Sequence, residues 1–192
     1  MTQLYLSILS YLLGSILFGI VIAKIKGIEN LRTSGSGNVG ATNIARVSGN
    51  KKLGIVVAIL DALKGAIPVI VAGHFSLTDS EIATVGIMAV IGHIFPIWHS
   101  FKGGKGVATF LGMNLLLDWR VGVFMAMTWL ITFKVTKVSS ISSIAMVIAS
   151  IVASYLLNLD NLWQVSLSAL LVILKHKGNI NRIISGKESK IF

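Results

Sequence analysis

The sequence predicts an all-α integral membrane protein with about seven transmembrane helices, several of them short or partly re-entrant, with the N-terminus outside and the C-terminus in the cytoplasm. The composition leads to this class, because 54% of the 192 residues are apolar and only 12% are charged, against roughly 25% in soluble domains. Seven spans of ~20 residues would use about 140 positions. We therefore expect a single polytopic domain over residues 1–192 and exclude a separate soluble domain.

The apolar runs account for these spans in chain order. Residues 4–23 carry no charge and are followed, not preceded, by basic residues, which is the reverse of a secretory signal. Residues 53–73 and 82–98 form the second and third spans. Residues 107–133 are predicted as a hairpin of two short helices, because a single helix would bury Asp118 and Arg120 at mid-membrane. Residues 138–157 and 162–174 complete the set.

Charge distribution supports the same topology. With the N-terminus outside, 15 of the 17 Lys and Arg residues fall on the inner side, while Arg120 is outside and Lys64 lies within a span. A net charge of +10 on so apolar a chain favours anionic lipid or a small anionic substrate over nucleic acid. The absence of cysteine excludes disulfides and zinc–thiolate sites, and we expect neither a metal nor a cofactor.

The first inner loop, residues 33–43, is rich in glycine and small polar residues. Glycines permit positive φ and let backbone N–H groups converge on an anion, and Arg46 can grip a phosphate with two hydrogen bonds. An ordinary flexible loop uses the same residue types, but the density of donors beside Arg46 favours an anion site. The candidate phosphate-binding residues here are Ser34, Gly35, Gly37, Asn38, Thr42, Asn43 and Arg46, and Ser36 is a candidate catalytic residue.

A second inner segment, residues 101–109, is a glycine-rich turn that opens the next helix. Such a turn binds anions through the helix dipole and free N–H groups, although a turn that anchors a span to lipid headgroups would look alike. The Walker A spacing is absent, so ATP is not implied. The candidate phosphate-binding residues are Lys102, Gly103, Gly104, Lys105, Gly106 and Thr109, and His93 is assigned a supporting helix-end hydrogen bond.

The third inner cluster follows the last span. His176 is a candidate general base or phosphate donor, or else an interfacial anchor of the helix end, and we favour substrate contact. Asn179 is a second candidate catalytic residue and Asn181 a candidate phosphate ligand, while Arg182 and Glu188 are assigned structural support, with Glu188 in an ion pair.

One pair of ionisable residues falls inside the second span. Asp61 and Lys64 are three residues apart and share one helical face. A functional site and a supporting salt bridge both explain an intramembrane pair, and both stay open.

The three inner segments together resemble those of the acyl-phosphate-dependent glycerol-3-phosphate acyltransferases of bacteria, the PlsY family. Residues 34–43 with Arg46 are similar to the first family motif, and residues 92–96 with 101–109 to the second. Lys177 and Gly178 depart from the polar character expected after His176. The residues similar to the third motif are His176, Asn179, Ile180, Arg182, Gly186 and Glu188.

The resemblance implies transfer of a fatty acyl group from acyl phosphate to the 1-hydroxyl of sn-glycerol 3-phosphate, giving lysophosphatidic acid and phosphate as the first step of phospholipid synthesis. It implies a multi-pass protein of the bacterial cytoplasmic (inner) membrane with its active site on the cytoplasmic side. The expected partners are glycerol 3-phosphate, acyl phosphate, membrane lipids and other lipid-synthesis enzymes.

For the reaction we favour direct attack by the acceptor, with His176 and Asn179 orienting it. The rival mechanisms use His176 as base or Ser36 as a covalent acyl carrier. A small organic-anion transporter is the alternative function, for which Asp61 and Lys64 would be natural. A non-catalytic lipid-binding scaffold is a third, and it predicts tolerance of substitutions at Gly104 and Arg46.

Overall fold

The computed structural model describes residues 1–190 as ten α-helices and one short 3-10 helix, with no strand in this range. The all-α class expected from the sequence is therefore confirmed. In chain order the elements are α1 (Thr2–Gly14), α2 (Phe18–Ile25), α3 (Ala41–Ser48), α4 (Lys51–Ala72), α5 (Asp79–Ile94), η1 (Ile97–His99), α6 (Val107–Leu117), α7 (Trp119–Thr136), α8 (Ser139–Leu156), α9 (Leu162–Lys175) and α10 (Lys177–Ile184).

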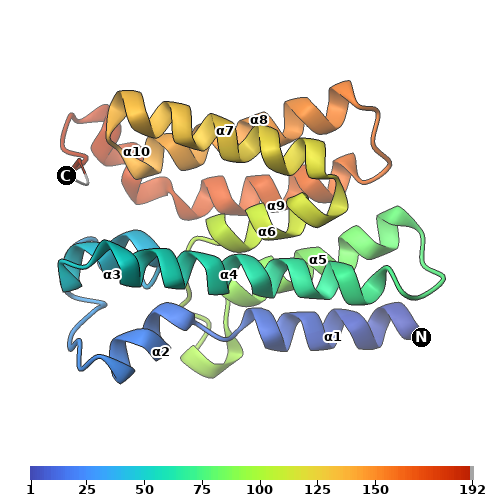
Figure 1. The fold of residues 1–192 in the computed structure, drawn as a ribbon, viewed down its shortest axis with the longest axis horizontal. Coiled ribbons are helices and arrows are strands. Elements are labelled where there is room, and N and C mark those ends of the chain that lie inside the picture. Colours follow the sequence, from blue (N-terminus) through green and yellow to red (C-terminus); the bar gives the residue numbers. More distant parts are fainter. Residues whose placement is uncertain (191–192) are drawn as a thin grey trace.

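The long helices lie side by side and alternate in direction, and the N-terminus is at the opposite end of the bundle from α10 (Figure 1). We call the end that carries α2, α3 and α10 the basic end. Among the described residues, four helical segments are long and apolar enough to cross a membrane, and α6 and α9 are shorter apolar helices. The four are Thr2–Ile25, Lys51–Ala72, Asp79–His99 and Ser139–Leu156.

The hairpin expected within residues 107–133 is present. Asp118 is the single residue between α6 and α7, and its extended backbone turns the chain back. Its carboxylate accepts a hydrogen bond from the Arg120 backbone N–H at 2.8 Å and forms an ion pair with the Arg120 guanidinium at 2.6 Å. The two charges that disfavoured one long helix thus cap the second helix and neutralise each other at the turn.

The first span differs from expectation, because residues 4–23 are not one continuous helix. Leu17 has an extended backbone, with φ −93° and ψ 92°, and separates α1 from α2. The hydroxyl of Ser15 donates to the Tyr11 carbonyl at 2.8 Å, and the Ile16 carbonyl accepts from the Lys64 ammonium. Side chains therefore satisfy backbone groups at the break, a contact that periodicity along one segment does not reveal.

The close contact between α4 and α6 depends on two glycines. A Cβ on Gly65 of α4 would lie 2.0 Å from the Thr109 carbonyl of α6, and one on Gly112 of α6 would lie 2.0 Å from the Ala62 carbonyl of α4. Small residues of this kind let membrane helices approach closely. They bring the start of α6 against the middle of α4, beside buried residues of the main core such as Phe110 and Met113.

Candidate active site

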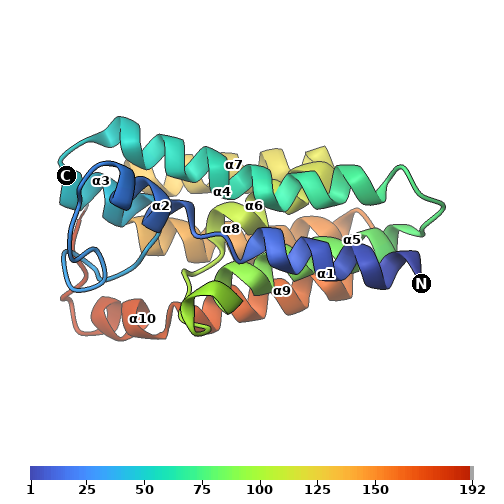
Figure 2. The same ribbon diagram turned by 90° about the horizontal axis from the view of Figure 1, so that it is seen from below.

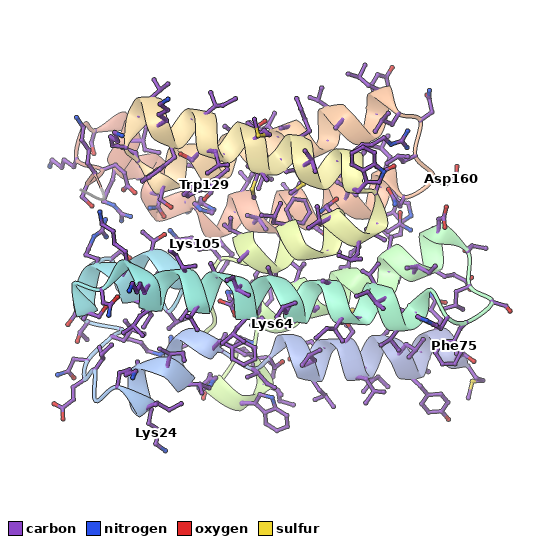
Figure 3. The ribbon with its side chains drawn as sticks, viewed as in Figure 1. Lys24, Lys64, Phe75, Lys105, Trp129 and Asp160 are labelled. Atoms are coloured by element: carbon purple, nitrogen blue, oxygen red, sulfur yellow. The ribbon has the colours of Figure 1, made fainter. Side chains whose placement is uncertain are left out.

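A cavity of about 500 Å³ lies at the basic end of the bundle. Its polar wall comes from the loop before α3, the starts of α3 and α6, the start of α8 and the tail after α9. Its apolar wall comes from α4, α6, α7 and α8, through Ala58, Val107, Ala108, Leu111, Trp129 and Met146. Figure 1 shows α6 between α4 and α7, and Figure 3 shows Lys105 and Trp129 in the region between these two helices. The cavity thus combines polar and apolar surfaces, as an amphiphilic ligand requires.

The first inner loop is held by the buried side chain of Asn43. Its amide oxygen accepts from the Ser36 N–H at 2.8 Å, and its amide nitrogen donates to the Leu31 and Ser34 carbonyls, each at 3.1 Å. Gly35 has φ +62°, and a Cβ there would lie 2.3 Å from the Asn43 amide oxygen. The loop is therefore ordered by specific contacts, and the alternative of an ordinary flexible loop does not describe it.

Two helices begin at the cavity. Gly40, Ala41 and Thr42 at the start of α3 line it, as do Gly106, Val107 and Ala108 at the start of α6. The first N–H groups of an α-helix have no partner within the helix, and the helix dipole places partial positive charge there. Two such starts facing one cavity, with Arg46 and Lys105 beside them, give this part of the cavity a positive potential that suits an anion.

The glycine turn before α6 works differently from expectation. The Gly103 N–H donates to the Ile94 carbonyl at 3.2 Å, and the Gly104 N–H donates to the His93 carbonyl at 3.0 Å. These donors cap the end of α5 and are not free to bind phosphate, so the assignment of Gly103 and Gly104 as phosphate ligands is wrong for their N–H groups. Gly106 lines the cavity with φ +83°, which a side chain would strain.

A chain of hydrogen bonds joins the second and third inner segments. The Lys105 ammonium donates to the Asn179 amide oxygen at 2.5 Å, and the Asn179 amide nitrogen donates to Glu188 at 2.6 Å. Glu188 also accepts from the Ser140 hydroxyl at 2.7 Å and from the Arg182 guanidinium at 2.6 Å. The ion pair expected at Glu188 is confirmed, with Arg182 as its partner.

The tail also reaches the first inner segment. The Arg46 guanidinium donates to the Ser189 hydroxyl at 3.2 Å. Figure 2 shows the segment after α10 running across the basic end toward α3. All three predicted clusters therefore meet at one place in the fold.

Burial and neighbouring charges lower the pKa values of both Lys105 and His176. Burial, together with Arg182 and Arg46, lowers the pKa of Lys105 to about 8, although Glu188 opposes the shift. Burial and the charge of Lys105 lower the pKa of His176 to about 4. Partial burial alone would raise the pKa of Glu188, but hydrogen bonds from Asn179, Ser140 and Arg182 outweigh it and lower the pKa. At neutral pH the site holds a charged Lys105, a neutral His176 and an ionised Glu188.

His176 is buried at the wall of the cavity, between α9 and α10. Its Nδ1 lies 2.7 Å from the Val172 carbonyl, which can only accept a hydrogen bond. The proton of the neutral ring is therefore on Nδ1, and Nε2 carries a lone pair. The ring is suited to accept a hydrogen bond from a substrate hydroxyl, and its low pKa makes it a weak base.

Comparison with known proteins agrees with the family resemblance seen in the sequence. The family model described as glycerol-3-phosphate acyltransferase matches residues 4–186. The chain belongs to the glycerol-3-phosphate acyltransferase family. Its relatives include the glycerol-3-phosphate acyltransferase of Ehrlichia canis (strain Jake), 43% identical with 96% of each chain covered. That of Wolbachia pipientis subsp. Culex pipiens (strain wPip) is 44% identical with 99% of each chain covered.

The solved structures of this family extend the likeness to the whole fold. The crystal structure of PlsY (YgiH), an integral membrane glycerol 3-phosphate acyltransferase, in its glycerol 3-phosphate form superposes with a TM-score of 0.94 at 40% identity, covering 99% of this chain and 96% of that one. Its lysophosphatidic acid form gives 0.92 at 39% identity, covering 99% and 95%. The resemblance drawn from three motifs is therefore confirmed, this protein is an acyltransferase of the membrane, and the transporter and scaffold alternatives are not retained.

The structure brings most of the predicted site residues of this acyltransferase to the cavity wall. Those that line it are Gly35, Ser36, Asn38, Thr42, Arg46, Asp61, His93, Lys105, Gly106, His176, Asn179, Arg182 and Glu188. The others do not line it. Asn43 is buried beneath the loop, Ser34 and Gly37 are half-buried within it, and Thr109 is buried against Gly65 of α4. Lys102 and Asn181 are exposed at the surface and outside the cavity wall.

Several residues of the cavity wall were not predicted from the sequence. Ser139, Ser140 and Ser143 at the start of α8 and Trp129 of α7 line the cavity, and the Thr42 hydroxyl lies 3.2 Å from that of Ser139. None of these serines is among the site residues predicted from the sequence. Their position at the inner end of a span, where polar groups meet the basic clusters, is the signal that could have identified them.

Proposed function

We propose that this protein transfers a fatty acyl group from acyl phosphate to the 1-hydroxyl of sn-glycerol 3-phosphate, releasing lysophosphatidic acid and inorganic phosphate. One observation carries the proposal: two helix starts, Arg46 and Lys105 share a cavity with an apolar wall. Phosphate is common to donor and acceptor, and the acyl chain needs the apolar side. The crystal forms of the PlsY relative with glycerol 3-phosphate and lysophosphatidic acid support this choice of acceptor and product.

Phosphate binding falls to the polar half of the cavity. Arg46 and the first N–H groups of α3 are one set of donors, and Lys105 with the first N–H groups of α6 are the other. Two separate sets suit two phosphorylated substrates held together. Asn179, already bonded to Lys105 and Glu188, and Nε2 of His176 would orient the acceptor hydroxyl.

The acyl chain would occupy the apolar wall between α4 and α7, over α6. Ala58 and Ala108 leave room there, and Leu111, Trp129 and Met146 supply apolar surface. Trp129 is fixed by stacking on Phe133 at 4.8 Å between ring centroids. A rigid aromatic at this position gives the chain a defined surface to pack on.

In the mechanism we propose, the acceptor hydroxyl oxygen attacks the acyl carbonyl carbon directly. The bond from that carbon to the phosphate oxygen breaks, and the hydroxyl proton passes to a phosphate oxygen, so the products are the ester and hydrogen phosphate. The low pKa of His176 disfavours it as the base, and positioning with charge neutralisation by Arg46 and Lys105 supplies the acceleration. Ser36 then contributes its position in the loop and not a covalent link.

The test is an assay of the purified protein with labelled acyl phosphate or acyl-CoA, each with glycerol 3-phosphate. Acyl phosphate should give equal amounts of lysophosphatidic acid and released phosphate, and acyl-CoA should give little product. Preference for acyl-CoA would refute the donor. Labelled acyl-protein trapped with acyl phosphate alone, and lost in Ser36→Ala, would replace direct attack by the covalent route.

We propose further that the protein lies in the bacterial inner membrane with the basic end in the cytoplasm, where it could meet other lipid-synthesis enzymes. The chain has no cysteine, so single cysteines report topology without background. In intact cells an impermeant thiol reagent should label Asp160→Cys and spare Lys190→Cys. The reverse pattern would refute this orientation.

A further inference from the structure

Three titratable side chains are buried together inside the membrane-spanning helices, and the proposed chemistry uses none of them. Asp61 and Lys64 come from α4 and His93 from α5, and they are 2%, 1% and 5% exposed. The Lys64 ammonium lies 3.0 Å from the Asp61 carboxylate, and Nδ1 of His93 lies 3.6 Å from the same oxygen. Charged groups are costly at this depth, and apolar residues often replace a buried ion pair without loss of stability. A role beyond packing is therefore needed to explain this triad.

At one end of the triad, Lys64 contacts the break between α1 and α2. The Lys64 ammonium donates to the Ile16 carbonyl at 2.5 Å, between α1 and α2, and lies 5.7 Å from the centroid of the Phe18 ring. Figure 3 shows Lys64 at the middle of α4, level with this break. The segment from α2 leads into the first inner loop, whose end is the start of α3 at the cavity.

At the other end of the triad, His93 contacts the Gly103–Gly104 turn. The His93 carbonyl accepts from the Gly104 N–H, and a Cβ on Gly104 would lie 2.1 Å from Nε2 of His93. The imidazole is thus enclosed between the Asp61 carboxylate on one side and Gly104 on the other. The residue after Gly104 is Lys105, whose ammonium reaches Asn179 in the cavity.

We propose that Asp61, Lys64 and His93 are positioning residues for acyl transfer: they tie the break in the first span to the Gly103–Gly104 turn, so that the α3 loop and Lys105 face one cavity. The inference rests on the proposed function, since positioning matters only if the two sets of donors act together. None of the three residues is assigned contact with the reacting atoms.

The contact between His93 and Gly104 gives a direct test. Gly104→Ala should reduce kcat/KM for glycerol 3-phosphate on the order of 100-fold, because the methyl group meets the imidazole and displaces Lys105. His93→Asn keeps a donor facing Asp61 and removes the part of the ring that the new methyl group would meet. In the double variant, kcat/KM for glycerol 3-phosphate should therefore equal that of His93→Asn alone. Gly73→Ala at the opposite end meets only ordinary contacts, 3.4 Å or longer, and should match wild type. Additive losses in the double variant would overturn the proposal.

A second pair of variants separates positioning from charge balance. Asp61→Asn alone leaves a buried ammonium without its carboxylate, so poor folding is expected. Asp61→Asn with Lys64→Met removes both charges, and we expect a folded protein whose KM for glycerol 3-phosphate rises roughly tenfold with a smaller change in kcat. Wild-type kinetics in this double variant would reduce the pair to a structural salt bridge and overturn the proposal.

The proposed function and the positioning role of the triad can be refuted independently of each other. If wild type transfers no acyl group, the proposed function fails, and the same variants are then compared by the thermal stabilisation that inorganic phosphate gives. Restored stabilisation in Gly104→Ala with His93→Asn, relative to Gly104→Ala, supports the triad, and its absence refutes it.

Discussion

Lys105 gives the sharpest test of the site, because its charge at neutral pH depends on where the fold places it. Burial beside Arg46 and Arg182 lowers its pKa to about 8. In the proposed role the ammonium form binds phosphate and the neutral amine does not, so we expect substrate capture below this pKa and its loss as pH rises through it. An ordinary exposed lysine, with a pKa near 10.4, would show no loss in this range.

The size of the effect follows from the titration. A group with a pKa of about 8 is roughly 91% protonated at pH 7 and roughly 9% at pH 9, so kcat/KM should fall about tenfold between these values. In Lys105→Arg the guanidinium stays charged above pH 12, so the rate is reduced by altered geometry but no longer falls from pH 7 to 9. Lys105→Met should lose about 2 to 3 kcal/mol of binding, or roughly 30- to 150-fold in kcat/KM.

The assay is phosphate release at limiting glycerol 3-phosphate across this pH range, on protein purified in detergent. Lys134→Arg, at an exposed position of α7 outside the cavity wall, is the matched control and should keep the wild-type profile. If Lys105→Arg loses activity between pH 7 and 9 as steeply as wild type, another group titrates and the assignment to Lys105 is wrong.

Four further predictions test other parts of the site. Glu188→Gln removes a charge that raises the pKa of Lys105, so the alkaline loss of kcat/KM should move to lower pH and the rate should drop on the order of tenfold. Since the pKa of His176 is about 4, His176→Ala should lower kcat/KM without removing any titration between about pH 5 and 7, and loss of such a titration would identify it as the base. Trp129→Ala should raise KM for acyl phosphate about tenfold with little change for glycerol 3-phosphate, whereas Trp129→Phe should stay near wild type, and equal effects on both substrates would contradict an acyl-binding role. Gly112→Val forces side-chain atoms onto α4, so the thermal unfolding midpoint in detergent should fall by several degrees, and an unchanged midpoint would show that α4 and α6 separate at no cost.

Much of the architecture was decided by local features of the sequence. Apolar runs of spanning length must be helices in a bilayer, because a helix satisfies its own backbone hydrogen bonds there. Asp118 and Arg120 are expensive within a membrane, so a turn at this point was predictable from their charge alone. The motif residues were likewise recognisable, because the glycines, Arg46 and Lys105 have the residue types and spacing that are typical of an anion site.

The tertiary structure decided which of these groups face the cavity. The N–H groups of Gly103 and Gly104 looked free along the chain, but the end of α5 takes both of them. Asn43 looked like a ligand and instead supports the loop from beneath. The break between α1 and α2 depends on Lys64 of α4, and the place of the α8 serines in the site depends on Glu188 of the tail, both far away in the chain. Residue type and spacing determine what a group can bind, but only the packing of helices distant in sequence determines which of its possible partners it meets.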